Sequence, residues 1–384
     1  MRRGYLYISV ISAIAIYGCT KPFSPPGVAT NANILVVEGL INTNDSTIIK
    51  LSRTVIVANK TTANPETKAI ITIENAQATV GTLTETVKGT YVIPNLKLDN
   101  TKQYRLRVKT SNGKTYLSDL VDAKVAPPID SIGFTATGSG LQIYANAHDA
   151  TNNTRYYKYS YSEAWQFHAQ IDAGFTGDGI DVTSRTPSQD FYTCFGSDSS
   201  ANTVLNSTQT LSNDIVYQFP IVEVASTSEK METKYSILVS QQALTKDAYA
   251  FWTNLQKNTE QLGSIFDAQP SLAPSNIHNI NDASEPVIGF ISAGTTQKKR
   301  IFITRAQLPQ GWQVTYPNGC GLDSAYYSTP TLPHTNTVVQ FGLIVIGSWV
   351  VNRFGDYGGG WMFTTRQCAD CTLRGTKTQP AFWK

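Results

Sequence analysis

Short apolar runs separated by turn residues fill the first third of the chain, and they predict β-strands. Residues 34–41 are almost continuously apolar, as in a buried strand, whereas residues 47–52 alternate apolar and polar side chains, as in a half-buried strand. The same patterns predict further strands at residues 69–73, 90–93, 104–110 and 115–120. Between the last two, Asn112-Gly113 indicates a two-residue hairpin turn, because both central positions of such a turn need positive φ.

The same part of the chain resembles the tyrosine corner of immunoglobulin-like and fibronectin-like sandwiches. Leu98 is followed by Tyr104-Arg105-Leu106-Arg107-Val108, and in that motif the Tyr hydroxyl donates a hydrogen bond to nearby backbone at the edge of the sandwich. An amphipathic strand with one buried Tyr would give the same residues. We expect residues 31–126 to form an N-terminal immunoglobulin/fibronectin-like β-sandwich.

A larger β-rich domain is expected over residues 127–384. Ala126-Pro127-Pro128 predicts a linker before it, because consecutive prolines cannot join a sheet ladder. Tyr157, Tyr159 and Tyr161 alternate with polar residues and indicate a strand with an aromatic face. Further strands are predicted at residues 235–239, 286–293 and 300–304, a core strand or pair of strands at 338–351, and a long loop over the Gly-, Asp- and Ser-rich residues 174–200.

One clear amphipathic helix follows residues 235–239. Thr245 can cap its N-terminus, and Asp247 suits the positive end of the helix dipole. Apolar side chains then recur at the helical spacing i, i+3, i+4 and i+7 and form one stripe. The stripe consists of Ala248, Phe251, Trp252 and Leu255. We expect this stripe to dock the helix on a sheet rather than to bind a partner.

The chain begins with the pattern of a bacterial lipoprotein signal. Arg2 and Arg3 precede an apolar run over residues 5–17, which is too short for a membrane span of roughly 20 residues. Gly18-Cys19 follows directly, and a small residue before Cys is where such signals are cleaved and the thiol diacylated. An ordinary signal peptide or an uncleaved anchor is the alternative interpretation.

Two segments are assigned on this basis. Residues 1–18 are expected to be a signal peptide, and residues 19–30, which contain three prolines, a lipidated tether. Acyl chains on Cys19 would anchor the protein in a membrane, since each buried CH₂ contributes about 0.8 kcal/mol.

Composition and charge agree with an exported β protein. Charged residues make up 15% of the chain, below the roughly 25% of an average soluble protein. A mean hydropathy of −0.19 excludes a polytopic membrane protein. The formal net charge is +3, and loss of Arg2 and Arg3 with the signal peptide would leave about +1. A near-neutral chain has no long-range attraction for nucleic acid, so no nucleic-acid partner is expected.

Four cysteines remain once lipidation takes Cys19, and an even number in an exported chain predicts disulfides. They are Cys194, Cys320, Cys368 and Cys371. We expect Cys368 and Cys371 to close a small loop that holds Phe382 and Trp383 against the second domain, and pairing of Cys320 with one of them is the alternative. Free thiols, a redox pair and a zinc site are the other interpretations, although a four-Cys zinc site would need a second close pair.

No motif identifies a catalytic, cofactor or metal site. The sequence contains no G-x-S-x-G elbow, H-E-x-x-H pair, P-loop or G-x-G-x-x-G loop. The Gly-rich residues 355–360 indicate a hairpin loop. Polar residues between 267 and 277 could ligate a cation, but loops more often use such residues to satisfy their own backbone. The histidines are widely spaced, without a nucleophile in motif context: His148, His168, His278 and His334. We expect a non-enzymatic protein without a cofactor or bound metal.

Several segments together resemble a Bacteroidota lipoprotein family known as domain-of-unknown-function family 4249. They are Leu35-Val36-Val37-Glu38-Gly39, Leu51-Ser52-Arg53-Thr54, Tyr156-Tyr157, Tyr161 with Glu163 and Trp165, Tyr235-Ser236-Ile237-Leu238-Val239-Ser240-Gln241-Gln242, Phe251-Trp252, Gly263-Ser264-Ile265-Phe266-Asp267, Gln269-Pro270-Ser271, Asn276-Ile277, Arg300-Ile301-Phe302-Ile303, Cys368-Ala369-Asp370-Cys371, Gly375 and Pro380-Ala381-Phe382-Trp383. Cys194-Phe195 departs from the Cys-Trp of the family pattern, keeping the Cys and losing the indole.

The resemblance implies a two-part, mostly β lipoprotein of the outer membrane, often encoded beside TonB-dependent transporters. It supplies no catalytic residues. We therefore expect an accessory, capture or interaction module that works beside such a transporter, with the side of the membrane that it faces left open. A stand-alone glycan- or peptide-binding lipoprotein and an unrecognised hydrolase are the alternatives. The many aromatic residues invite glycan binding, yet most fall at regular strand or helix positions and are expected in the core.

Overall fold

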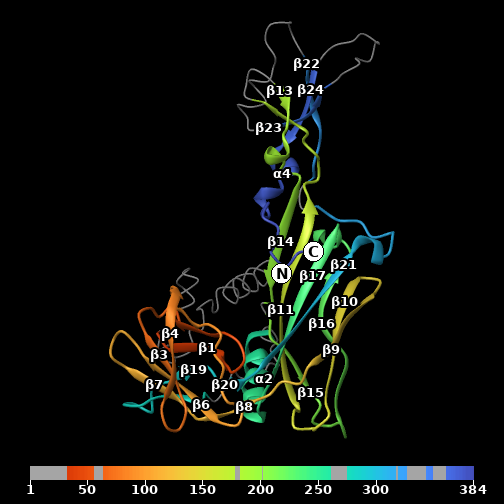
Figure 1. Ribbon diagram of the computed structural model, residues 1–384. Helices are drawn as coiled ribbons and strands as arrows, with labels where there is room; N and C mark the ends of the chain where they lie inside the picture. Colours follow the sequence, from red (N-terminus) through yellow and green to blue (C-terminus); the bar gives the residue numbers. More distant parts are fainter. Residues whose placement is uncertain are drawn as a thin grey trace, which may run out of the picture.

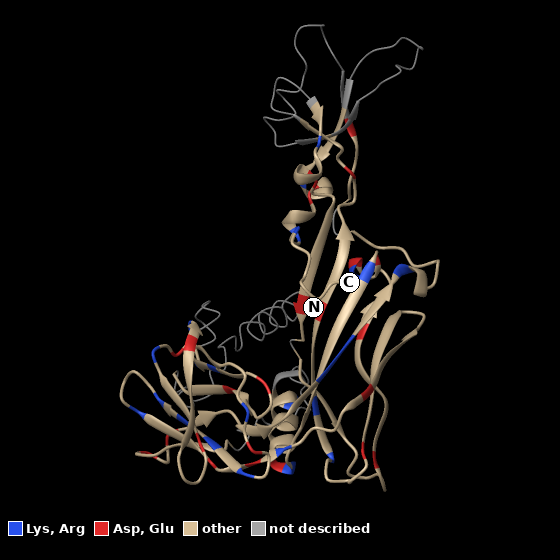
Figure 2. Cartoon of the chain, in the orientation of Figure 1, with Lys and Arg blue, Asp and Glu red and all other residues tan. Residues whose placement is uncertain are grey.

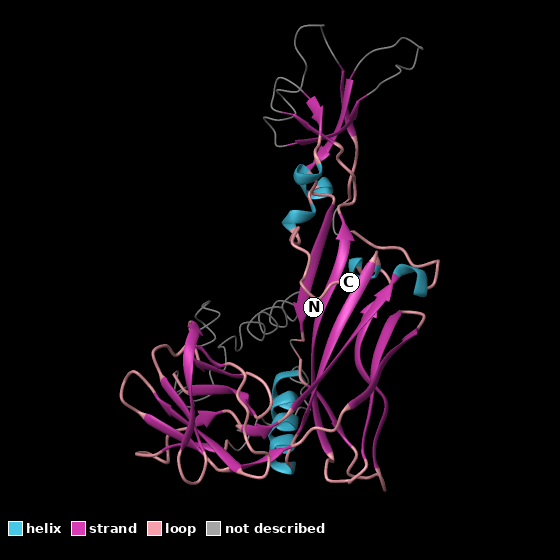
Figure 3. Ribbon diagram, viewed as in Figure 1, coloured by secondary structure: helices cyan, strands magenta, loops and turns pink. Residues whose placement is uncertain are grey.

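The protein is described by a computed structural model over residues 33–55, 64–177, 182–200, 202–260, 275–316, 319–326, 343–348 and 360–384. It consists mostly of β-sheet, as the sequence predicts (Figure 3). Two β units lie side by side with helix α2 (Lys246–Glu260) between them, and a smaller group of strands extends from the far end of the second unit (Figure 1). Among the described helices, none is long and apolar enough to cross a membrane.

The first unit is a β-sandwich-like sheet that closes on itself. Its strands are β1 (Leu35–Asn42), β2 (Thr47–Arg53), β3 (Ile70–Glu74), β4 (Thr79–Val87), β5 (Thr90–Ile93), β6 (Gln103–Lys109), β7 (Thr115–Ser118) and β8 (Val121–Lys124). β6 pairs with β3 on one side and with both β7 and β8 on the other. The inward residues of these strands, such as Leu35, Ile49 and Tyr91, are fully buried in one core.

The tyrosine corner is confirmed, and the hairpin turn is corrected in detail. The Tyr104 hydroxyl donates to the carbonyl oxygen of Asp99 at 2.9 Å. In the β6–β7 hairpin only Gly113 of the Asn112-Gly113 pair has positive φ, at 87°. The backbone N–H of Thr110 donates to Lys114, and that of Gly113 donates to Thr110. The loop therefore has three residues with Gly113 in the left-handed position, not two.

The first unit also contains a segment that the sequence analysis placed in the second domain. Residues 275–294, called the returning segment from here on, carry β18 (Ile277–Asn279), β19 (Val287–Ile288) and β20 (Ser292–Gly294). β18 pairs with β7, β19 pairs with β1, and β20 inserts between β1 and β8. The boundary of 31–126 was therefore incomplete, because a local pattern shows that a strand exists but not which sheet it joins.

Two glycines allow the returning segment to approach the older strands closely. A Cβ atom on Gly289 would lie 2.2 Å from the carbonyl oxygen of Val37, and one on Gly294 would lie 2.2 Å from that of Lys124. Both glycines also have φ values, +146° and +155°, that side-chain-bearing residues rarely adopt. Glycine is thus required at both positions by backbone contact.

The connection between the units is short and hydrogen-bonded. Only Thr295 separates β20 from β21 (Thr296–Thr304), which belongs to the second unit. Thr295 donates from its backbone N–H to Lys124 at 2.9 Å, and its hydroxyl accepts from the backbone of Ala126 at 2.8 Å. The predicted linker at Ala126-Pro127-Pro128 is fastened as well, since the side chain of buried Gln241 donates to the Pro127 carbonyl at 2.7 Å. The two crossings of the chain therefore run side by side.

The second unit packs two sheets face to face around its own core. One sheet contains β9 (Ile129–Ala136), β10 (Gly140–Asp149) and β16 (Asp214–Ala225), and the other contains β11 (Tyr156–His168), β14 (Thr193–Ser199), β15 (Val204–Ser207), β17 (Lys234–Ala243) and β21. Tyr157 and Tyr159 confirm the predicted aromatic face, because both are fully buried between the sheets. Short 3₁₀ helices lie at Pro187–Gln189, Glu229–Met231, Arg305–Gln307 and Cys371–Leu373.

The prediction of a long loop over residues 174–200 is wrong. This segment contains β12 (Phe175–Gly177), β13 (Val182–Ser184) and β14, and β14 pairs with β11 along its whole length. Gly196 shows why composition misled: a Cβ atom there would lie 2.3 Å from the indole ring of Trp165. Its glycine permits packing of a strand rather than freedom of a loop.

Beyond the second unit, a small sheet forms the far end of the molecule. It contains β22 (Asp323–Tyr326), β23 (Leu343–Ser348) and β24 (Gly360–Thr365) and leads into the short helix α4 (Arg366–Ala369). β23 falls within the strand predicted at 338–351. The hairpin loop predicted at residues 355–360 lies outside the described residues, apart from Gly360 at the start of β24.

Two disulfides are present, but their pairing differs from the one expected. Cys194 of β14 pairs with Cys371, and Cys320 pairs with Cys368. Between Cys368 and Cys371 the chain changes direction at Asp370, which has extended backbone angles and caps the following 3₁₀ helix by accepting from the Thr372 N–H at 2.9 Å. The two cysteines consequently point to different partners. The bond between Cys194 and Cys371 ties residues 177 positions apart in the sequence.

The C-terminal aromatic residues divide into one buried and one surface group. Trp383 is 9% exposed and packs edge-on against Phe195 and Phe302. Phe382 is 39% exposed, and the guanidinium of Arg300 stacks on its ring at 3.5 Å. The expected docking of the chain end on the second unit is therefore correct for Trp383 and wrong for Phe382.

This difference predicts unequal effects of two truncating substitutions. Trp383→Ala should destabilise the fold by about 3 kcal/mol, the low end for a buried Trp, because it leaves a cavity between β14 and β21. Phe382→Ala should cost about 1 kcal/mol or less, since most of its surface stays in contact with water or one side chain. Urea unfolding of the purified domain compares the two. An equal, small effect of both substitutions would show that the chain end is not docked.

Candidate functional site

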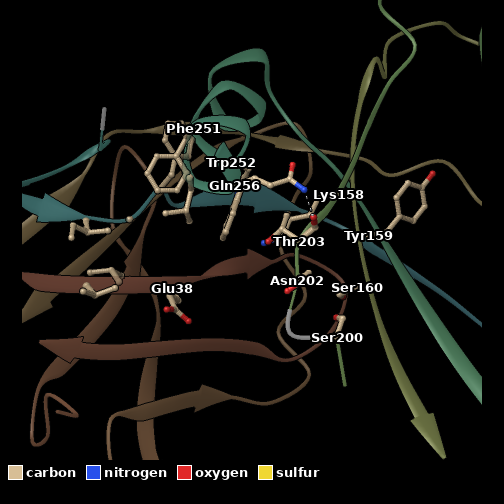
Figure 4. A pocket seen from close by; sticks show the side chains of 16 residues that line it. Glu38, Lys158, Tyr159, Ser160, Ser200, Asn202, Thr203, Phe251, Trp252 and Gln256 are labelled. Atoms are coloured by element: carbon tan, nitrogen blue, oxygen red, sulfur yellow. Dashed lines mark hydrogen bonds between the residues drawn. The ribbon is translucent and has the colours of Figure 1, made fainter. Parts of the chain in front are cut away.

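The most enclosed polar and aromatic surface lies where the two units meet. Two adjoining cavities of about 530 and 440 Å³ open there and share four lining residues, Glu38, Lys158, Ser160 and Trp252. We call their combined lining the junction cleft. In Figure 4, α2 lies above this cleft, β1 forms the opposite wall, and β11 closes one end. Both volumes fall within or near the range of ligand pockets in other proteins.

Helix α2 brings Trp252 to the cleft. The Thr245 hydroxyl accepts from the backbone N–H of Ala248 at 3.2 Å, which confirms the predicted N-cap. Ala248 and Phe251 of the apolar stripe are buried, and the Phe251 ring lies 5.5 Å from that of Phe290 in the returning segment. The stripe thus docks the helix on the junction between the units rather than on one sheet. Trp252, half-buried, lines the cleft.

Strand β11 brings Lys158 to the same place. Because side chains alternate along a strand, the burial of Tyr157 and Tyr159 in the core directs Lys158 to the opposite face. Its ammonium nitrogen lies 3.2 Å from the centroid of the Trp252 ring. A cation over the face of an indole is attracted by the ring quadrupole, and the contact is worth about 0.5–2 kcal/mol.

The electrostatic setting of Lys158 is unusual for a lysine. Burial lowers its pKa to about 8, while the carboxylate of Glu38 acts in the opposite direction. Among the described residues, no Asp or Glu forms an ion pair with it. The group is therefore an ammonium that has lost much of its water without gaining a counter-ion.

The cleft has an apolar half and a polar half that meet at Lys158. Side chains of Val36, Phe251, Trp252, Leu255, Ile288 and Phe290 line the first cavity. The second cavity is lined mainly by hydroxyl, amide and ammonium groups, among them Ser46, Lys50, Ser240, Gln242, Thr296 and Lys298. Lys and Arg positions occur on both sides of the junction, on the first unit and along β21 (Figure 2).

Polar contacts between the units fix the rim of the cleft. Lys298 of β21 pairs with Asp45 at 2.5 Å, and the pKa of the Asp45 carboxyl is lowered by this hydrogen bond. The side chain of Asn42 donates to the Thr296 hydroxyl at 3.1 Å. Both contacts join the β1–β2 end of the first unit to the start of β21, so they hold the two walls at a set distance.

The histidines singled out in the sequence do not come together. His148 pairs with Asp130 at 2.8 Å on the exposed face of β10, and this contact raises its pKa. His168 lies 3.1 Å from Glu232 and stacks on Tyr192, whereas His278 lies beside Asp119 on the first unit. His334 lies outside the described residues.

The other sequence candidates divide between structural roles and masked segments. Asn276, from the proposed cation loop, uses its side chain to bond both backbone groups of Ile291, at 2.8 and 2.9 Å. Asp267 and its neighbours lie outside the described residues, as do Cys19 and the tether. Across the described ranges, no group of three His, Cys, Asp or Glu side chains could hold a metal ion.

Sequence patterns alone did not identify Lys158 or the use of Trp252. Lys158 occupies an ordinary polar position in an alternating strand, and Trp252 occupies an ordinary apolar position in a helix. Their contact joins β11 to a helix about 90 residues later, and a local pattern carries no information on such a contact. The one available signal was that a lone cation interrupts a run of tyrosines in β11.

The family to which the chain belongs follows from a family model. Residues 20–300 match the model described as Domain of unknown function (DUF4249). The chain therefore belongs to this family. The match spans the first unit, the returning segment, α2 and most of the second unit, so it includes every wall of the junction cleft.

Other comparisons add nothing to the function. No curated protein matches the chain. Among solved structures, the chain is similar to chitinase ChiA74 from Bacillus thuringiensis, with 14% identity and a TM-score of 0.14. That similarity covers 47% of this chain, which spans only 30% of the chitinase chain. A likeness at that level carries no argument about activity.

The setting of Lys158 predicts its titration. Because burial disfavours the charged form, the ammonium should lose its proton with a midpoint near pH 8, well below the ordinary lysine value of about 10.4. Reductive ¹³C-methylation followed by NMR titration of the purified protein would measure this, with Lys158→Arg used to assign the resonance. A midpoint near 10.4 would mean that the cleft leaves this amine in contact with bulk water.

Proposed function

We propose that the protein is an outer-membrane lipoprotein that captures a ligand or partner without transforming it, beside a TonB-dependent transporter. The observation that carries the proposal is the junction cleft. A pocket of about 530 Å³, with aromatic walls and a few convergent polar groups, has the size and lining of a small-molecule binding site. Its one distinctive ionisable group, Lys158, faces an indole instead of a general acid or a nucleophile.

The proposed compartment is supported by the cysteines and the N-terminal pattern. Disulfides persist in oxidising compartments and are rare in the cytosol, and the four described cysteines form two of them. The apolar run that ends in Gly18-Cys19 supplies both the export signal and the lipid anchor. The tether of residues 19–30 would place the β units at the membrane surface.

The proposed partner is supported by the resemblance to Bacteroidota lipoproteins encoded beside such transporters. A protein held at the membrane by its lipid can raise the local concentration of a ligand near a transporter without any new contact. The same cleft also favours a second candidate, a lipoprotein that binds its ligand alone. The two candidates differ in whether the lipoprotein forms a stable complex in the membrane.

Affinity purification from detergent-solubilised outer membrane separates them. The tagged native protein should bring down a TonB-dependent transporter in a near-stoichiometric band. Cys19→Ala should abolish this band, because the chain is released to a soluble fraction or left uncleaved at the inner membrane. Processed Cys19→Ala protein that still fractionates with the outer membrane would contradict the anchor. Wild-type protein that is anchored there without a transporter would contradict the accessory role.

A further inference from the structure

We infer that the junction cleft binds a small amphiphilic carboxylate, with its apolar body against α2 and its carboxylate at Lys158. The inference deepens the proposed function and rests on it for its premise that the cleft is a binding site. It follows from three features of the cleft: an apolar chamber, a cation at the mouth of that chamber, and hydroxyl groups beyond the cation.

The apolar chamber fits a short hydrocarbon body. Phe251, Trp252 and Leu255 project from one side of α2, and Ile288 and Phe290 of the returning segment face them (Figure 4). The chamber has a volume of about 530 Å³, within the range of sites that take small ligands. An apolar group placed there gains from leaving water, by about 25 cal/mol for each Å² that is buried.

The cation is placed to receive a single negative charge. Lys158 lines both cavities, so its ammonium lies at the boundary between the apolar and polar halves. Having lost water to burial without gaining an ion pair among the described residues, it would be stabilised by an incoming anion. Deprotonation becomes easier in the empty cleft for the same reason.

The remaining charges of the cleft also favour an anion. Glu38 is directly opposite Lys50 in the β1–β2 ladder, so the two side chains share one face of the sheet as neighbours of opposite charge. Lys298 is paired with Asp45. Lys158 is thus the cation of the lining whose charge is least compensated by a carboxylate.

The chemistry of the lining favours a carboxylate over two other ligands. A phosphate or sulfate is usually held by Arg side chains or by several N–H groups together, and no Arg lines either cavity. A sugar ring would need an open indole face, but the Lys158 ammonium occupies one face of Trp252. Hydroxyl groups of Ser160, Ser240 and Thr296 lie beyond the cation and can donate to a carboxylate oxygen.

Calorimetric titration of the purified, full-length mature protein with decanoate tests the inference. N-acetyl-Leu-Phe is titrated in parallel, because a peptide end and a fatty acid present the same chemistry of an apolar body and one carboxylate. Decanol and acetate are the controls, since the first lacks the charge and the second lacks the body. We expect binding of at least one of the two carboxylate probes, with both controls at least tenfold weaker.

Variants then locate the binding site. Lys158→Met removes the cation at similar length and should weaken the bound probe at least tenfold. Lys109→Met is the matched control, because it removes one lysine charge from the exposed end of β6, away from the cleft. Failure of both probes to bind, equal binding of decanol and decanoate, or equal affinities in the two variants would overturn the inference.

A measurement on the unmodified protein keeps the test decisive if Lys158→Met does not fold. Affinity for the carboxylate probe should fall about tenfold between pH 7 and pH 9, as the Lys158 ammonium, with a pKa of about 8, loses its proton. The other charged or titratable groups that line the cleft are Glu38, Lys50, Lys298 and Tyr159. A flat affinity over this range would overturn the role of Lys158.

The outcome is separable from that of the proposed function. Carboxylate binding by the purified protein without a co-purifying transporter would contradict the accessory role and leave the ligand class standing. A transporter complex with no carboxylate binding would contradict the ligand class alone.

Discussion

The insertion of β20 between β1 and β8 is the contact on which the rest of the molecule depends. β20 has only three residues, yet it pairs in parallel with a strand on each side. A single residue, Thr295, then carries the chain into β21 of the second unit, and its side chain and backbone are hydrogen-bonded to the other crossing. Hydrogen-bonded strands on both sides of a one-residue connection leave little freedom for a hinge. The two β units are therefore held as neighbours at a set angle.

The junction cleft is a consequence of that arrangement. Its walls come from β1, from the returning segment, from α2 and from β11, which no single domain could supply. Phe251 of α2 contacts Phe290 of the returning segment, so the helix is positioned by both units. The cost of the arrangement is borne by Lys158, whose ammonium is partly desolvated. The contact with Trp252 offsets part of that cost, by about 0.5–2 kcal/mol. A cleft that keeps an ammonium without a counter-ion is one that favours an anionic occupant.

Local patterns in the sequence predicted much of the fold for definite physical reasons. The alternation in β2 and β11, the cap at Thr245 and the corner at Tyr104 each depend on neighbours within a few residues, so the sequence contains the whole signal. β4 escaped because only Leu83 of its nine residues is buried. β14 escaped because Gly196 is needed for packing against Trp165 and reads as a turn residue.

What could not be predicted depends on distant partners. Cys371 pairs with Cys194 instead of Cys368 because Asp370 redirects the chain between the two neighbouring cysteines. The residues of the returning segment look like ordinary strands, and nothing local shows that they pair with a sheet formed 170 to 250 residues earlier. The candidate site inherits this limit: Lys158 and Trp252 become distinctive only when the two units have been assembled.

Hydrogen exchange of backbone amides tests the shared sheet most directly. If β20 completes the first unit, the amides of residues 292–295 should exchange as slowly as those of β1 and β2, because all would open only when that unit unfolds. Exchange should also remain slow when a carboxylate probe is absent, since the cleft is formed by the fold itself. Rapid exchange of residues 292–295, with β1 and β2 still protected, would contradict the account, because the returning segment would then be detached and the cleft would lose a wall.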